Sequence, residues 1–339
     1  MKLLDTLSGQ KITPPPMWVM RQAGRYLAEY RAVRATTTDF ISFCLTPDKA
    51  SEVTLQPIRR FGLDAAIIFS DILMVPWALE RNVHFVTGDG PKLTPLETAG
   101  SLSNDLLEGL PDKWAPVGEA IRLTRQNLPS ETALIGFSGA PWTLITYMAE
   151  GGSSRDFATC RNWLWSDRAG IEKLLEQLVE AIIQFLTVQA EAGANVLMLF
   201  DSWAGAVPAS HRNMMVIEPA QKIIAGLRSR GIMQPVIYFP KQIGEGLIAF
   251  ADRVDCQAIA VDHNTDLLWA TKTLPTHMAL QGNLDPLSLL AAGPEMEQAV
   301  DAILEACSDR PHIFNLGHGI TPPTPPEHLA KLVSLVRGK

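Results

Sequence analysis

The sequence contains few cysteines, little positive charge and no long apolar run. Its 339 residues include 4 cysteines and 7 histidines, and 36 acidic residues outnumber 29 basic ones, which gives a net charge of −7. This acidic balance argues against nucleic acid or an anionic membrane as a partner. No apolar stretch approaches the roughly 20 residues of a transmembrane helix. The N-terminus also lacks the features of a secretory signal peptide. We therefore expect a cytoplasmic protein.

The cysteines and histidines do not form any familiar ligand pattern. Cys44, Cys160, Cys256 and Cys307 lie far apart, with no CxxC or HxC pair and no HExxH motif. Zinc sites and dithiol redox motifs depend on close spacings of this kind. We therefore predict reduced, partly buried thiols, and neither a metal nor a cofactor.

Short apolar runs alternate with helical periodicity along most of the chain. Eight runs end in small or polar residues: 17–20, 65–70, 133–137, 195–200, 235–239, 258–261, 278–281 and 313–316. Helical patterns occupy residues 171–192, 219–229, 244–253, 267–274, 286–306 and 326–336. Apolar strands that alternate with helices indicate a parallel sheet covered on both faces.

Eight such units predict an α/β protein with one (β/α)₈ barrel (TIM barrel) domain over residues 1–339. An open doubly wound sheet is the alternative, because the number of strands does not determine closure. Residues 80–110 do not fit the repeat, and the Thr-Gly-Asp-Gly-Pro run at 87–91 suggests a small hairpin there.

In a barrel of this kind, the active site lies at the carboxyl ends of the strands. Polar residues gather after the predicted strands: Arg21 to Arg25, Ser70-Asp71, Ser138, Asp201-Ser202, Lys241, Asp262-His263, Asn283 and His318. Ser and Asp at such junctions also cap helices, and for Ser138 and Asp201 the two interpretations have even weight. Asp71 precedes the apolar residues 72–75, which favours a buried functional carboxylate.

The segment 16–27 carries the strongest indication of a ligand. Its apolar run ends in Arg21 and Arg25, with Gly24 between them. Arginine binds carboxylates with two parallel hydrogen bonds and stays charged at any working pH. The pair fits an anionic substrate, and it fits a pair of surface salt bridges equally well.

Two other motifs match only in part. The run 136–140 resembles a nucleophile elbow, but Ala140 stands in place of its last glycine, and no acid and histidine follow convincingly. The run 244–249 matches a dinucleotide-binding pattern by letters, yet it follows the fifth apolar run rather than the first. A hydrolase and a dinucleotide-binding enzyme are therefore not favoured.

The longer motifs resemble the uroporphyrinogen decarboxylase family. Residues 20–26 are similar to its N-terminal signature, and residues 136–144 with Tyr147-Met148 are similar to its second signature. Further similar segments are 54–57, 69–73, 200–205, 281–286 and 315–319, so the resemblance extends from residue 16 to about residue 327. The chain departs from the family pattern at Ala28 and around residues 261–266, outside the matched site residues.

The resemblance implies a single (β/α)₈ barrel, a homodimer with facing active-site clefts, and a reaction without metal or cofactor. That reaction converts the four acetate side chains of uroporphyrinogen III to methyls and yields coproporphyrinogen III. By position, the resemblance assigns carboxylate binding to Arg21 and Arg25, and the loop between them to Gln22, Ala23 and Gly24. It further assigns the central aspartate to Asp71 and other substrate contacts to Tyr147, Ser202 and His318.

The chemistry of this substrate agrees with these residues. Eight carboxylates surround a ring of pyrrole N–H donors, so the site needs cations at its rim and one acceptor at its centre. An ionised Asp71 would also stabilise the cationic ring formed when a pyrrole carbon is protonated. A nearby Arg21 or Arg25 would keep that carboxylate ionised. Tyr147 and His318 are the candidate proton donors, and Arg21, a poor acid itself, is a candidate for directing a proton from a carboxyl group or a water. The sequence does not identify the acid.

Two alternative functions follow from the same sequence. A corrinoid-dependent methyltransferase of the same superfamily would need a cysteine near the last strand, where this chain has His318; Cys307 lies before that strand. A non-catalytic tetrapyrrole carrier would keep the arginines but would have no need of Asp71.

Overall fold

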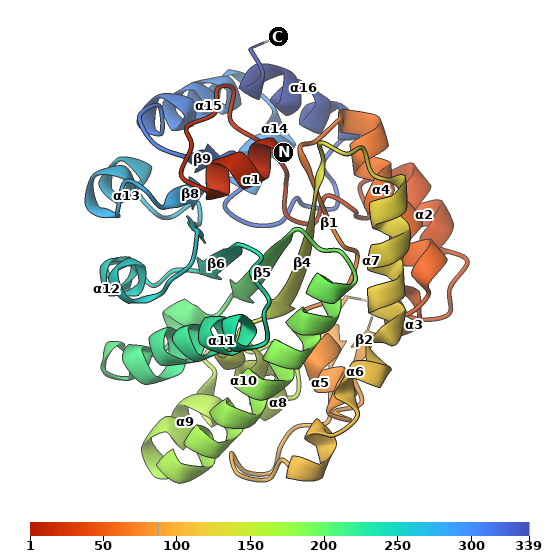
Figure 1. Ribbon diagram of the computed structural model, residues 1–339, viewed down its shortest axis with the longest axis vertical. Coiled ribbons are helices and arrows are strands. Elements are labelled where there is room, and N and C mark those ends of the chain that lie inside the picture. Colours follow the sequence, from red (N-terminus) through yellow and green to blue (C-terminus); the bar gives the residue numbers. More distant parts are fainter. Residues whose placement is uncertain (87, 339) are drawn as a thin grey trace.

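The computed structural model describes residues 1–86 and 88–338. A curled, parallel, seven-stranded sheet forms its centre, with the order β1-β4-β5-β6-β7-β8-β9. Helices surround this sheet (Figure 1). The strands are β1 (Ala65–Ile67), β4 (Ala133–Gly139), β5 (Val196–Asp201), β6 (Val236–Pro240), β7 (Ala258–Ala260), β8 (Ala279–Gln281) and β9 (His312–Ile313).

Seven of the eight predicted strands are confirmed. Nearly every residue in them is buried, as expected where helices cover both faces of a parallel sheet. The eighth prediction, residues 17–20, is wrong as a regular strand, because only Met17 forms a parallel bridge, to Phe314. The Trp18 N–H still donates to the Phe314 carbonyl at 3.3 Å, but the next two backbone N–H groups donate to side chains: Val19 to Gln22 Oε1 at 3.2 Å and Met20 to Asn315 Oδ1 at 3.1 Å.

The helices follow the predicted periodicity closely. Those on the N-terminal side are α1 (Lys2–Leu7), α2 (Ala28–Arg34), α3 (Phe40–Cys44), α4 (Pro47–Phe61), α5 (Met74–Ala78), α6 (Leu110–Lys113) and α7 (Ala115–Asn127). They are followed by α8 (Pro141–Glu150), α9 (Ala158–Ser166), α10 (Arg168–Glu191), α11 (Glu218–Ser229), α12 (Gly246–Arg253), α13 (Leu267–Thr273), α14 (Pro286–Ala291), α15 (Pro294–Ala306) and α16 (Pro326–Val336). Short 3₁₀ or π turns occupy η1 (Asn104–Leu107), η2 (Ala204–Ala206), η3 (Ala209–His211) and η4 (Asn213–Ile217).

The single helix predicted over residues 286–306 is wrong, because the chain forms two helices there, α14 and α15. Ala292 adopts a left-handed backbone with φ 50° at the end of α14. Pro294 begins α15, where a missing N–H is tolerated, whereas inside one continuous helix it would have removed a hydrogen bond.

The predicted hairpin between β1 and β4 is confirmed. Strand β2 (His84–Val86) pairs antiparallel with β3 (Gly90–Lys92), and Lys92 also bridges to Gly152 after α8. Thr87, at the start of the predicted turn, lies outside the described residues. The Phe85 ring in β2 packs 4.4 Å from the Phe40 ring, between centroids, which connects the hairpin to α3. No helix among residues 1–86 and 88–338 is long and apolar enough to cross a bilayer.

A buried glutamine connects the longest helix to the centre of the sheet. Gln189 of α10 is fully buried; its Oε1 accepts the Phe137 N–H at 2.8 Å and its Nε2 donates to the Phe137 carbonyl at 2.9 Å. Gly136 lies beside this side chain, and a Cβ there would come within 2.8 Å of Gln189 Oε1. The amide therefore completes the hydrogen bonds of a strand residue and fixes the position of the Phe137 ring.

We predict that Gln189→Leu lowers the free energy of unfolding by about 2–4 kcal/mol, because it leaves a buried N–H and a buried C=O without partners. Urea denaturation followed by circular dichroism measures the change. Gln184→Leu, on the same helix, is the control, since Gln184 bonds only the side chain of Glu180. Equal denaturation midpoints for the two variants would contradict the assignment.

Candidate active site

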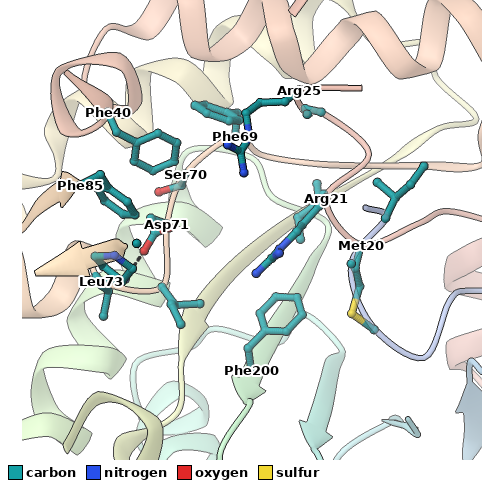
Figure 2. Close-up of a pocket in the computed structure, with 18 of the residues that line it drawn as sticks. Met20, Arg21, Arg25, Phe40, Phe69, Ser70, Asp71, Leu73, Phe85 and Phe200 are labelled. Carbon is teal, nitrogen blue, oxygen red and sulfur yellow. Dashed lines mark hydrogen bonds between the residues drawn. The ribbon is translucent and has the colours of Figure 1, made fainter. Parts of the chain in front are cut away.

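A cavity of about 710 Å³ opens at the carboxyl ends of the strands. The rings of Phe137, Phe200 and Phe239 come from β4, β5 and β6 and form an apolar part of its lining. Phe200 meets Phe137 edge-to-face at 5.5 Å, between centroids. Polar groups reach the cavity from the loops that follow the strands, and Figure 2 shows several of them around this apolar lining.

The turn after residue 20 directs Arg21 into the cavity. Arg21 has φ 63°, a left-handed conformation that costs most residues other than glycine about 1–2 kcal/mol. Its side chain passes over Gly319, where any Cβ would collide with Arg21 Cδ. In Figure 2 the guanidinium lies above the Phe200 ring, on the side facing Asp71. A glycine on one loop therefore makes room for an arginine from another.

Gln22 holds this turn from inside the core rather than from the cavity. Its side chain is fully buried and donates to the Ala65 carbonyl of β1 at 3.1 Å. The Tyr26 hydroxyl donates to the Gln22 carbonyl at 2.8 Å. By contrast, Ala23, Gly24 and Arg25 all line the cavity. The loop between the two arginines is therefore fixed by hydrogen bonds on its inner side.

Asp71 follows β1 and reaches the cavity from the side opposite Arg21 (Figure 2). Its Oδ1 accepts the Leu73 N–H at 2.8 Å, which orients the carboxylate. Burial raises the pKa of Asp71 to about 6, although the hydrogen bond from Leu73 and the charge of Arg21 both act to lower it. Asp71 is therefore mostly ionised at neutral pH, which lies only about one unit above its pKa.

His318, Tyr147 and Ser202 line the same cavity, and they come from the loop after β9, from α8 and from the end of β5. The Gly319 N–H lies 2.7 Å from His318 Nδ1, so Nδ1 accepts and the neutral ring carries its proton on Nε2. Burial, together with Lys241, Arg21 and His263, lowers the pKa of His318 to about 3. Burial raises the pKa of Tyr147. Both side chains are therefore neutral hydrogen-bond donors near pH 7.

Ser138 and Asp201 neither line the cavity nor cap the helix that follows them. The Ser138 hydroxyl donates to the adjacent Gly139 carbonyl at 3.0 Å. Asp201 is fully buried, and its Oδ1 accepts the Thr143 hydroxyl at 2.7 Å; the same Thr143 oxygen accepts the Trp203 N–H at 3.1 Å. This network connects the start of α8 to the chain on both sides of Ser202.

The sequence did not identify several cavity residues on the N-terminal helices and the hairpin. Tyr30 and Arg34 of α2 line the cavity, as do Phe40 of α3 and Phe85 of β2. The Tyr30 ring packs 5.6 Å from the Phe69 ring, between centroids, which turns this face of α2 toward the cavity. Spacing four apart places Tyr30 and Arg34 on one helix face, but it does not say which way the face points.

The three arginines that line the cavity have no acidic partner. Arg21, Arg25 and Arg34 form no salt bridge with any described residue, whereas Arg59 on α4 pairs with Glu52 at 2.9 Å. Surface salt bridges were the alternative interpretation of the first two arginines, and the structure does not contain them. An acidic protein thus concentrates unpaired positive charge at one cavity, which suits a ligand with several carboxylates.

The cysteines lie away from this cavity. All four are buried and unpaired, and none is among its described lining residues. In the described part of the chain, no three His, Cys, Asp or Glu side chains gather closely enough to hold a metal ion.

Comparisons with known proteins agree with the motifs. The uroporphyrinogen decarboxylase family model matches residues 1–338. A uroporphyrinogen decarboxylase from Rhodospirillum rubrum is 46% identical, over 98% of this chain and 96% of its own length. One from Granulibacter bethesdensis is 47% identical, over 99% of this chain and 98% of its own length. A methyltransferase structure from Methanosarcina mazei covers 99% of this chain and 97% of its own with a TM-score of 0.79 at 19% identity, which shows a shared fold. The chain belongs to the uroporphyrinogen decarboxylase family.

Proposed function

We propose that this protein removes the carboxyl groups of the four acetate side chains of uroporphyrinogen III and so forms coproporphyrinogen III. The observation that carries the proposal is a single carboxylate, Asp71, facing a cavity whose other charged lining groups are arginines. Membership of the family supports the reaction. The cations fit the peripheral carboxylates, and Asp71 fits the ring of pyrrole N–H donors.

The proposed chemistry uses the pyrrole as its own electron sink. A proton adds to the pyrrole α carbon next to the ring carbon that carries the acetate, and the ring becomes cationic. The bond between the acetate methylene and its carboxylate then breaks, CO₂ leaves, and the electron pair returns to the ring as an exocyclic double bond. A proton adds to that methylene to make the methyl group, and the ring carbon loses its proton. Each decarboxylation therefore consumes one proton overall.

Asp71 acts in this scheme as the fixed negative charge beneath the ring. Its carboxylate accepts the pyrrole N–H bonds and stabilises the cation more strongly than the neutral ring, which lowers the barrier. Arg21 and Arg25 bind substrate carboxylates, and Arg21 directs a proton from a carboxyl group or a water in this scheme. Tyr147, Ser202 and His318 Nε2 donate hydrogen bonds to substrate oxygens. The low pKa of His318 disfavours it as the acid at neutral pH.

Gln22 supports this site through the backbone. Because its side chain bonds the Ala65 carbonyl, we infer that it shapes the Arg21 turn and that Ala23 and Gly24 present backbone surface to the substrate. We also propose that the segment from residue 16 to residue 20 closes the sheet into a single-domain (β/α)₈ barrel. In support, the Phe314 N–H donates to the Pro16 carbonyl and the Asp64 N–H donates to the Met17 carbonyl, each at 2.9 Å.

The family resemblance further supports a homodimer with facing clefts, and buried free cysteines support a cytoplasmic location. The methyltransferase alternative is not favoured, since no cysteine is among the described cavity residues. A non-catalytic tetrapyrrole carrier would bind the same ring, and the first experiment below separates it from an enzyme.

We expect the purified, chelator-treated protein to convert uroporphyrinogen III under anaerobic conditions, in steps, to the four-carboxyl product. Asp71→Asn should lower turnover by about 100- to 1000-fold, the usual effect of removing a group that stabilises transition-state charge. Products are oxidised and separated by carboxyl number. Asp252→Asn, an exposed change on α12, is the control. Tight binding without turnover would favour the carrier, and activity that survives Asp71→Asn would overturn the mechanism.

We expect kcat/KM to fall as the pH drops below about 6, because protonation of Asp71 removes the charge on which the reaction depends. Initial rates between about pH 5 and pH 8 at constant ionic strength test this. A kcat/KM that stays level down to about pH 5 would show that Asp71 is not the titrating group.

The raised pKa of Asp71 also predicts a stability effect. Its folded-state pKa of about 6 exceeds the ordinary 3.8, so the folded protein binds more protons than the unfolded chain between these values. Stability from this group is therefore lost as the pH rises from about 4 to 6. At 1.36 kcal/mol per unit, the difference of about 2 units corresponds to about 3 kcal/mol.

Asp71→Asn should accordingly raise the free energy of unfolding by up to about 3 kcal/mol at pH 7.5, and by little at about pH 4. Urea denaturation at the two pH values tests this, with Asp252→Asn as the matched control. An equal effect of Asp71→Asn at both pH values would refute the assigned pKa shift.

A further inference from the structure

Lys241 is a nearly buried cation at the carboxyl end of β6. Its side chain is 9% exposed. The backbone on both sides is fixed, because the Lys241 N–H donates to the Asp201 carbonyl at 3.1 Å and the Lys241 carbonyl accepts the Gly205 N–H at 3.0 Å. The residue therefore belongs to the rigid end of the sheet and not to a mobile surface loop.

The ammonium of Lys241 has no counter-ion. It forms no salt bridge or side-chain hydrogen bond with any residue that the structure describes, and its Nζ lies 5.7 Å from the centre of the Trp203 ring. Asp262 is the acid that acts on it, yet the Asp262 oxygens already accept the N–H groups of Gln242 at 2.8 Å and Asn264 at 3.0 Å. Lysines are rarely buried without a partner, because desolvating an unpaired charge is costly.

Lys241 lies beside the lining of the cavity, because it comes two residues after the lining residue Phe239, and its Nζ lies near Trp203, which follows the lining residue Ser202. Lys241 and Arg21 both lower the pKa of His318, and Arg21 together with burial lowers the pKa of Lys241. These mutual charge effects support a common subsite for the ammonium, the Arg21 guanidinium and the His318 ring. The proton on His318 Nε2 adds a third donor without adding charge. Two cations and a neutral donor together suit an anionic ligand group.

We propose that Lys241 binds a peripheral carboxylate of the substrate in a subsite that it shares with Arg21 and His318. This inference rests on the proposed function and adds a residue to it. Eight carboxylates enter with uroporphyrinogen III, and the charged groups among the described cavity-lining residues that meet them are Arg21, Arg25 and Arg34. Lys241 supplies another cation from the side of β6, across the sheet from α2.

A lysine suits this place for a chemical reason. The four acetates react in turn while the ring centre stays over Asp71, so acetate and propionate groups of different reach arrive in turn at a given rim position. A compact ammonium on a flexible four-carbon stem adapts to both, whereas the planar guanidinium demands one geometry. Lys241 therefore binds ground and transition states alike, and its loss affects KM more than kcat.

The test compares Lys241→Met, Lys241→Arg and the wild type in anaerobic turnover of uroporphyrinogen III. We expect Lys241→Met to raise KM about tenfold or more, as for a lost charge-assisted hydrogen bond, with kcat changed less than about twofold. Lys241→Arg keeps the charge and should recover most of the affinity. Lys272→Met, which removes an exposed charge on α13, should leave KM unchanged.

Thermal unfolding of each variant separates this role from a structural one. Lys241→Met should melt at or above the wild-type temperature, because it removes an unpaired buried charge. An unchanged KM overturns the proposal. So does a KM defect that accompanies a lower melting temperature and is not recovered by arginine.

Binding of coproporphyrinogen III, measured by equilibrium dialysis, gives a readout that does not depend on turnover. If the wild type binds but does not decarboxylate, the proposed function fails, while weaker binding by Lys241→Met than by Lys272→Met still supports the subsite. Equal binding by these two variants overturns the subsite alone. No binding by the wild type overturns both.

Discussion

The cavity depends on arginine side chains that form no salt bridge with any acidic side chain that the structure describes. Arg21, Arg25 and Arg34 line one cavity with no acidic partner, in a chain whose net charge is −7. Such charges repel one another, and flexible side chains would turn away into solvent. The fold prevents this with backbone supports: the Gln22 amide fixes the Arg21 turn against β1, and Gly319 leaves room for the Arg21 side chain. A polyanionic substrate completes the electrostatic balance that the protein leaves open.

Positive charge in the cavity helps to keep Asp71 ionised. Burial alone favours its neutral form, while the Leu73 N–H and the Arg21 charge favour the ionised form, and the result is a pKa of about 6. The opposite holds for His318, where burial, Lys241, Arg21 and His263 suppress the imidazolium. Arg21 thus helps both to keep an acid ionised and to keep a base neutral. Both protonation states suit a site that must accept N–H groups at its centre and donate to oxygens at its edge.

The parallel strands were readable from the sequence because both faces of each are buried, so the apolar runs are nearly continuous. The prediction was wrong at residues 17–20, where the side chains of Gln22 and Asn315 accept backbone N–H groups that a neighbouring strand would otherwise take. The bond to Asn315 joins residues distant in sequence, so the local pattern does not reveal it. The break at Pro294 was readable, since proline favours the first turn of a helix over its interior.

The site was predictable to the extent that it lies at strand ends. Ser202 directly follows β5, Asp71 and His318 lie four and five residues after β1 and β9, and a parallel sheet brings such positions to one edge. Tyr30 and Arg34 were missed because they sit on a helix, whose orientation is set by the packing of Tyr30 on Phe69. Local spacing specifies which residues share a helix face, and tertiary packing decides what that face meets.

At Arg21, whose backbone is left-handed, selection for stability and selection for ligand binding favour different residues. Glycine would occupy that φ without steric strain and would also remove a repelling charge, so a population of variants chosen only for thermal resilience would drift toward glycine there. Arginine is retained at this position only while ligand binding by its guanidinium is under selection. The identity of this one residue in a variant of the chain therefore reports whether the cavity is still under selection for its ligand.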